Sequence, residues 1–155
     1  MALRAVQTIW IRHAPRRWLD VGTGSGILAV AAARLGATEV FALDPERASP
    51  PQALAMARLN GVESRVTAWR GGLDTVWGPF PAVVANLVAD LIGDHSAALA
   101  DLVEPGGTLF AGGIVDRRWP ETSARLEAAG LHSTVVLARG RWRGGLWKRP
   151  VDAGF

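Results

Sequence analysis

Cysteine is absent from this sequence of 155 residues. Without thiols the chain can form no disulfide, no thiolate metal site and no covalent thiol intermediate. The three histidines, His13, His95 and His132, lack the short spacing of metal ligands, so we predict no bound metal. Stability must then come from an apolar core, and any chemistry must use oxygen and nitrogen groups.

Long apolar runs are lacking as well. No run approaches the ~20 residues that a membrane-spanning helix requires, and four arginines interrupt the first 17 residues, which therefore do not resemble a signal peptide. These features predict a cytoplasmic protein without membrane contact. The length suits a single domain, residues 1–155, with an N-terminal helix in 1–16 and the core in 17–148.

Lysine occurs once, at Lys148, so arginine dominates the formal charge of +3 and the sequence pI of about 10.9. Arginine, tryptophan and glycine alternate from Arg139 to Arg149, a pattern that can bind phosphates and stack on RNA bases. A closing β-hairpin with one apolar and one basic face explains the same alternation and is favoured. Burial of Trp142 and Trp147 would support the hairpin, whereas exposed, coplanar indoles would favour RNA.

The most informative stretch is a short apolar run that ends in Asp20 and is followed by glycine at 22, 24 and 26. The spacing differs from the dinucleotide fingerprint G-x-G-x-x-G and from the phosphate loop G-x-x-x-x-G-K-[ST]. Glycine permits positive φ and lets a small molecule lie against main-chain N–H groups. We therefore predict a loop that binds a polar or anionic ligand without cradling a phosphate.

The rest of the chain alternates between the two element types. Helices are predicted at 3–14, 27–35, 52–59, 88–103 and 119–129, and strands at 18–21, 39–43, 65–69, 82–85, 108–111, 131–138 and 142–148. This order predicts an α/β, Rossmann-like, doubly wound and mostly parallel sheet that closes with an antiparallel hairpin. In such sheets ligands bind beyond the carboxyl ends of the strands, where the strand order reverses.

Two acids at predicted strand ends indicate a nucleoside ligand. Asp44, before Pro45, can accept both hydroxyls of a ribose, although it could also cap the next helix. Leu73 and Asp74 could face an adenine ring and its amine, or lie in a solvated loop. Without phosphate motifs the best candidate is S-adenosylmethionine, with its carboxylate on the loop amides and Asp20 holding the loop and the ligand's amino group.

Asn86, followed by Leu87, ends a fully apolar strand. Methyl transfer from a sulfonium is an in-line displacement that depends on the positioning of a neutral amine more than on a strong base. The Asn86 amide can accept a hydrogen bond from an N–H of that amine or orient its lone pair. It could also cap the helix that follows, and the two roles are compatible.

These motifs resemble class I S-adenosylmethionine-dependent methyltransferases and, more closely, the PrmA family, which methylates a ribosomal large-subunit protein. The resemblance runs from about 17 to about 148 and is carried by residues 19–29, 60–62, 84–91, 105–109 and 113–114. It implies a class I methyltransferase fold, S-adenosyl-L-methionine as cofactor, and transfer to lysine or N-terminal amines. By this likeness Gly22, Asp44 and Asn86 contact the cofactor, and the substrate amine approaches Asn86 and Leu87.

The sequence departs from the family pattern in three places. The family's N-terminal recognition domain and an upstream Gly-Thr-Gly-x-His-x-Thr-Thr segment are expected to lie outside this chain. The fourth strand begins with Phe80-Pro81 where the family has Phe-Asp. A small-molecule methyltransferase, or a non-catalytic or RNA-binding domain that retains the fold, is therefore an alternative. The predicted catalytic residues are Asn86 and Leu87, and the predicted cofactor-binding residues are Asp20, Gly22, Thr23, Gly24, Gly26, Asp44, Pro45, Leu73, Asp74 and Asn86.

Overall fold

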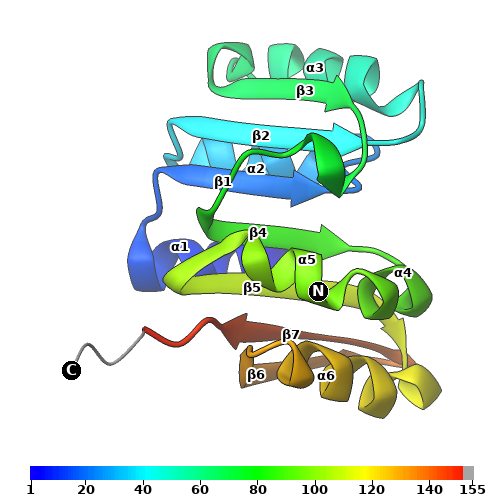
Figure 1. Ribbon diagram of the computed structural model, residues 1–155. Coiled ribbons are helices and arrows are strands. Elements are labelled where there is room, and N and C mark those ends of the chain that lie inside the picture. Colours follow the sequence, from blue (N-terminus) through cyan, green and yellow to red (C-terminus); the bar gives the residue numbers. More distant parts are fainter. Residues whose placement is uncertain (152–155) are drawn as a thin grey trace.

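A seven-stranded sheet forms the centre of the computed structural model, which describes residues 1–151 (Figure 1). The strand order is β3-β2-β1-β4-β5-β7-β6; β1 to β5 pair in parallel, and β7 runs antiparallel to both β5 and β6. This arrangement confirms the predicted fold class. The strands are β1 (Arg17–Val21), β2 (Glu39–Asp44), β3 (Val66–Arg70), β4 (Phe80–Asn86), β5 (Val103–Val115), β6 (His132–Arg139) and β7 (Trp142–Lys148).

Helices cover both faces of the sheet (Figure 1). One face carries α1 (Ala2–His13), α2 (Ile27–Leu35) and α3 (Ser49–Leu59), and the other carries α4 (Ala89–Asp94), α5 (Ser96–Asp101) and α6 (Trp119–Ala128). Three short 3-10 helices lie in the connections: η1 (Glu63–Arg65), η2 (Leu73–Thr75) and η3 (Asp116–Arg118). Within residues 1–151 no helix has the length and apolarity needed to cross a bilayer.

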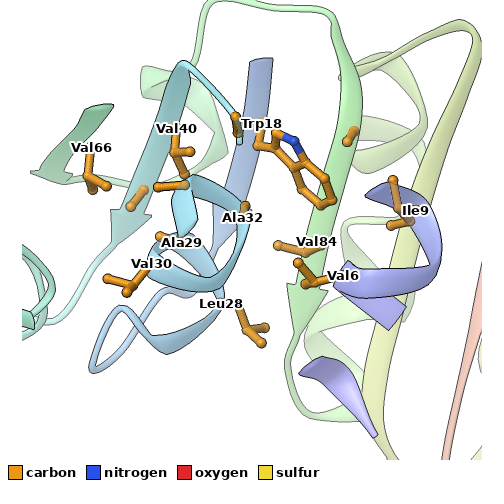
Figure 2. Close-up of a cluster of buried hydrophobic side chains, with 14 of the residues drawn as sticks. Val6, Ile9, Trp18, Leu28, Ala29, Val30, Ala32, Val40, Val66 and Val84 are labelled. Atoms are coloured by element: carbon orange, nitrogen blue, oxygen red, sulfur yellow. The ribbon is translucent and has the colours of Figure 1, made fainter. Parts of the chain in front are cut away.

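The core on the first face explains why the central strands read as apolar runs. Strands of a parallel sheet are buried on both sides, and β1 and β4 follow this pattern. Figure 2 shows Trp18 and Val84 of these strands beside Val6 and Ile9 of α1. The alanine-rich face of α2 packs on the same layer, because small side chains permit close approach of a helix to the sheet.

Two predicted helices differ from the observed ones. The helix predicted at 52–59 begins at Ser49, because Pro50 and Pro51 lie in its first turn, where no N–H is needed for helical bonding. The single helix predicted at 88–103 is wrong. The chain leaves the helical conformation at His95, with φ −106°, and two short helices, α4 and α5, follow one another instead.

The fifth strand is longer than predicted, extending from Val103 to Val115 instead of over 108–111. Residues 104–107, between the predicted helix and the predicted strand, produce a register shift in the pairing with β4, since Phe80 pairs with Val103 but Ala82 pairs with Thr108. Beyond Gly112 a second register shift, in the pairing with β7, lets the strand continue through Gly113, which has φ +83°. The pair Gly112-Gly113 therefore forms a bulge within β5 and does not end the strand.

The C-terminal hairpin is confirmed. Strands β6 and β7 pair from His132 and Lys148 up to Arg139 and Trp142. Trp147 is fully buried and packs on Trp119, with ring centroids 5.4 Å apart, whereas Trp142 is 42% exposed. Exposed, coplanar indoles, the arrangement expected for RNA stacking, are therefore not found at these two positions.

Candidate active site

The strand order reverses at β1, which lies between β2 and β4. The loop from Gly22 to Gly26 leaves the carboxyl end of β1 at this point. Asp44 ends β2 and Asn86 ends β4, so the sheet brings together three predicted features that are distant in sequence. The topology places the candidate site where open α/β sheets bind ligands.

Backbone bonds tie the glycine loop to the second strand. The amides of Gly22 and Thr23 both donate to the Leu43 carbonyl, at 2.9 and 3.0 Å, and the amide of Gly26 donates to the Thr23 carbonyl at 2.9 Å. The Gly24 amide donates to Oδ2 of Asp44 at 3.0 Å. Four amides of the predicted ligand-binding loop therefore already donate hydrogen bonds to acceptors within the protein.

The three glycines have different surroundings although all have positive φ, of +68°, +53° and +80°. A Cβ on Gly22 would lie 2.2 Å from Cδ2 of Leu87, and one on Gly26 would lie 2.6 Å from Cα of Ala53. A Cβ on Gly24 would meet no described atom within 4 Å. The loop is packed at both ends and faces open space in the middle.

Asp20 lies beneath the loop and is 1% exposed. Its Oδ2 accepts bonds from Oγ1 of Thr23 at 2.7 Å and from the amide of Ala29 at 3.1 Å. The carboxylate thus fixes the loop to the first turn of α2. A role toward the ligand's amino group remains a prediction, because Asp20 is not among the described residues that line the cavities above the loop.

Burial raises the pKa of Asp20 from 3.8 to about 6; nearby Asp44 adds to the rise, and the bonds from Thr23 and Ala29 oppose it. The folded pKa exceeds the unfolded one, so the stability of the parent protein falls as pH rises between about 4 and 6. Above that window the buried charge costs about 3 kcal/mol. Asp20→Asn removes this charge and keeps one oxygen for both donors.

We therefore expect the stability of Asp20→Asn, relative to the parent, to rise by up to about 3 kcal/mol between pH 4 and pH 7. Urea unfolding at pH 4, 5, 6 and 7 measures the difference. Asp74→Asn, at an exposed position, is the matched control and should show no such trend. A difference between Asp20→Asn and the parent that is the same at every pH would contradict the assignment.

A cavity of about 620 Å³ opens on the α2 side of the loop. The amides of Ser25, Ile27 and Leu28 at its wall donate to no acceptor within residues 1–151. For Ile27 and Leu28 this is expected, because they lie in the first turn of α2, whereas Ser25 precedes its N-cap residue, Gly26. These three amides can therefore bind an anionic group. The lining residues are Met1, Ala2, Leu3, Gly22, Thr23, Gly24, Ser25, Ile27, Leu28, Asn86, Gly113, Arg139 and Trp142.

A second cavity, of about 250 Å³, opens on the other side of Gly22. Asp44 lines it while Oδ1 accepts from the Glu46 amide at 2.9 Å and Oδ2 from Gly24. Each carboxylate oxygen has two lone pairs, so one on each oxygen remains for a ligand. The lining residues are Val21, Gly22, Leu43, Asp44, Pro45, Gly71, Gly72, Leu73, Leu87, Leu91, His95 and Leu99.

Leu87 stands at the boundary between the two cavities. Its side chain lies against Gly22, and its carbonyl oxygen would be 2.7 Å from a Cβ on Gly113. The segment after β4 therefore packs between Gly22 and Gly113. A side chain at either glycine would clash with Leu87. Asn86, the preceding residue, is exposed and lines the larger cavity.

Most predicted site residues come together here. Three of them do not line either cavity. Asp20 is buried below the loop, and Gly26 is buried against Ala53. Asp74 lines a neighbouring hollow with Leu73 and not the cavity beside Asp44. Wall residues from two further regions were not predicted from the sequence. They are Leu91, His95 and Leu99 of the α4–α5 region, and Met1, Ala2, Leu3, Arg139 and Trp142 from the two ends of the described chain.

The strand order, the glycine loop after β1, the acid at the end of β2 and the asparagine at the end of β4 define a class I methyltransferase fold. The chain belongs to the ribosomal protein L11 methyltransferase (PrmA) family, whose sequence model matches residues 1–149. The family resemblance is thereby confirmed.

Named relatives are longer than this chain. It is 44% identical over 124 residues to the ribosomal protein L11 methyltransferase of Pelotomaculum thermopropionicum, covering 79% of this chain and 40% of the relative. It is 37% identical over 128 residues to that of Syntrophotalea carbinolica, covering 83% and 42%. The chain thus spans about two fifths of the length of these relatives.

The fold is similar to the crystal structure of the ribosomal protein L11 methylase of Lactobacillus delbrueckii subsp. bulgaricus. The TM-score is 0.89 at 31% identity, and the match covers 96% of this chain and 77% of the other.

Proposed function

We propose that this chain binds S-adenosylmethionine and transfers its methyl group to amino groups of a protein, with a ribosomal protein such as L11 as the substrate. The observation that carries the proposal is the pair of cavities that meet at Gly22 beside Leu87. One offers free helix amides to an anion, and the other offers Asp44 to a pair of hydroxyls. Membership of a family named for methylation of L11 supports the choice of substrate.

The two cavities suit the two halves of this cofactor. The methionine carboxylate would lie on the amides of Ser25, Ile27 and Leu28, and the ribose hydroxyls on Asp44. The apolar wall of the smaller cavity, which includes Leu73, suits an adenine ring. Both volumes fall near the range of small-molecule sites, about 300–1,000 Å³.

When bound, the cofactor supplies a methyl group activated by its sulfonium. The chain's own contribution is to position the acceptor. Asn86 is exposed at the rim of the larger cavity, where its amide oxygen can accept a hydrogen bond from an N–H of a neutral amine and direct the lone pair into the cavity. Leu87 packs over Gly22 and restricts water beside the reacting atoms.

Asn86→Ala should lower kcat about tenfold, the loss expected for one orienting hydrogen bond, while the affinity for S-adenosylhomocysteine changes less. Steady-state kinetics with saturating cofactor gives kcat, and calorimetry gives the affinity. Asn60→Ala, at the end of α3, is a matched amide control away from both cavities. If the fall in kcat is accounted for by a loss of folded protein, Asn86 has a structural role only.

The function itself is tested by calorimetry and by labelling. If calorimetry detects no heat of binding when S-adenosylmethionine is added to the folded chain at millimolar concentration, the proposal is wrong. Radiolabelled cofactor, added with purified L11 or with a cell lysate, should label L11 on amino groups. If another protein is labelled instead, the proposed methyltransferase activity stands but L11 is not the substrate.

We also propose that residues 1–155 fold as one domain and act in the cytoplasm. The first proposal is supported by a single sheet that contains all seven strands of residues 1–151; residues 152–155 lie outside the described part. The second is supported by relatives named for a ribosomal protein.

A further inference from the structure

The geometry points to Arg139 as the side chain that binds the carboxylate of the cofactor's methionine half, opposite the free amides of α2. The inference rests on the proposed function and extends it to a residue that the glycine loop and the strand-end acids do not include. Arg139 and these amides line the same cavity of about 620 Å³. A carboxylate that accepts bonds from these amides therefore lies in the cavity that Arg139 also lines.

The charge around this cavity has one sign. Its described lining contains Arg139 and neither aspartate nor glutamate. An adjoining hollow of about 450 Å³ is lined by Met1, Arg4, Leu137, Ala138 and Arg139, again without an acidic side chain. Arg139 in the linings of both cavities, Arg4 in the lining of the adjoining hollow, and the lack of an acidic residue in either lining favour an anionic ligand group.

Arg139 has no partner of its own in the described part of the chain. Neither an ion pair nor a side-chain hydrogen bond engages its guanidinium within residues 1–151. Two acids of the same part of the fold pair with other arginines: Asp116 pairs with Arg143 at 2.7 Å, and Asp90 pairs with Arg118. The Arg139 fork is therefore available to a ligand.

The hairpin holds Arg139 in place. Arg139 pairs with Trp142 across the end of β6 and β7, and Gly140 makes the turn with φ +56°. Nη1 of Arg143 donates to the carbonyls of Gly140 and Trp142, at 2.8 and 3.1 Å, and the Asp116 amide donates to the Arg141 carbonyl at 2.9 Å. Because the backbone is fixed, binding orders only the Arg139 side chain.

An arginine in this position gives selectivity as well as affinity. Its planar fork matches a carboxylate in a bidentate pair, which a lysine cannot reproduce. The same charge disfavours a cofactor that has lost its carboxylate and keeps its amine. The cavity should therefore distinguish S-adenosylmethionine from its decarboxylated form through Arg139.

The test measures two ligands against four proteins, the parent chain and three variants. Calorimetry with S-adenosylmethionine and with its decarboxylated form is performed on the parent chain, Arg139→Ala and Arg141→Ala. Arg141 is the matched control, since it is exposed on the same hairpin and stacks over Trp142 at 5.3 Å from the ring centroid instead of lining the cavity. Arg139→Lys tests whether a positive charge without the planar guanidinium is sufficient to bind the carboxylate. Thermal melts check that every variant folds.

Arg139→Ala should bind S-adenosylmethionine about tenfold more weakly and the decarboxylated form no more weakly than the parent does. Arg141→Ala should leave the ratio of the two affinities unchanged, and Arg139→Lys should fall between parent and alanine. Equal losses of both ligands in Arg139→Ala, or the same ratio change in Arg141→Ala, would overturn the inference. A parent chain that binds neither ligand would instead overturn the proposed function.

Discussion

Asp44→Ala is expected to weaken the binding of S-adenosylhomocysteine at least about a hundredfold, because two hydrogen bonds to a charged acceptor contribute about 3 kcal/mol or more. The carboxylate borders the smaller cavity and is 9% exposed. It also fixes the Gly24 amide, so its removal loosens the loop on which the other half of the ligand depends. Calorimetry on the folded variant measures the affinity.

Asp74→Ala provides the matched control for this experiment. It removes an equal charge from the neighbouring hollow, beside Leu73, and should change the affinity less than threefold. Urea unfolding of Asp44→Ala is needed in parallel, since two backbone donors lose their acceptor. An Asp44→Ala protein that is folded and binds within threefold of the parent would show that the ribose does not lie on Asp44.

The second large effect concerns stability. Gly26→Ala forces a side chain into φ +80° and places its Cβ 2.6 Å from Cα and 2.7 Å from Cβ of Ala53. The left-handed conformation costs about 1–2 kcal/mol, and overpacking against backbone adds about 1–3 kcal/mol. We expect a total loss of about 2–5 kcal/mol in the free energy of unfolding, measured with urea.

Gly24→Ala separates the two causes. Gly24 also has positive φ, of +53°, but its Cβ would meet no described atom within 4 Å. Only the conformational cost, about 1–2 kcal/mol, should remain. Similar losses in the two variants would mean that the contact between the loop and α3 is not tight.

The sequence predicts the parts of this fold that depend on local patterns. The apolar runs of β1 and β4, the alanine-rich α2 and the alternating C-terminal hairpin are all observed. Local patterns misled where a residue type has two uses. Pro50 and Pro51 begin α3 instead of preceding it, and Gly113 allows a bulge that β5 passes through. Nothing in the 88–103 pattern indicates the break at His95.

The part of the candidate site that lies at the carboxyl ends of the strands could be predicted from the sequence. Gly22, Asp44 and Asn86 converge because parallel strands share one carboxyl edge, which a sequence pattern can indicate. Arg139 and Ala2 carry no such mark, because only the packing of α1 and the hairpin brings them to the cavity. Asp20 carries the family's motif yet lies under the loop, since the depth of a side chain depends on its neighbours.

Residues 1–3 and the hairpin residues Arg139 and Trp142 wall the same cavity, from the two ends of the described chain. During synthesis the early segment leaves the ribosome long before the late one, and the cavity lacks a wall until β7 has paired with β5. A ligand that binds only the folded protein adds its binding energy to the stability of both segments at once. A chain in which β7 has not yet paired with β5 therefore holds no complete site, and ligand binding requires that both segments have folded.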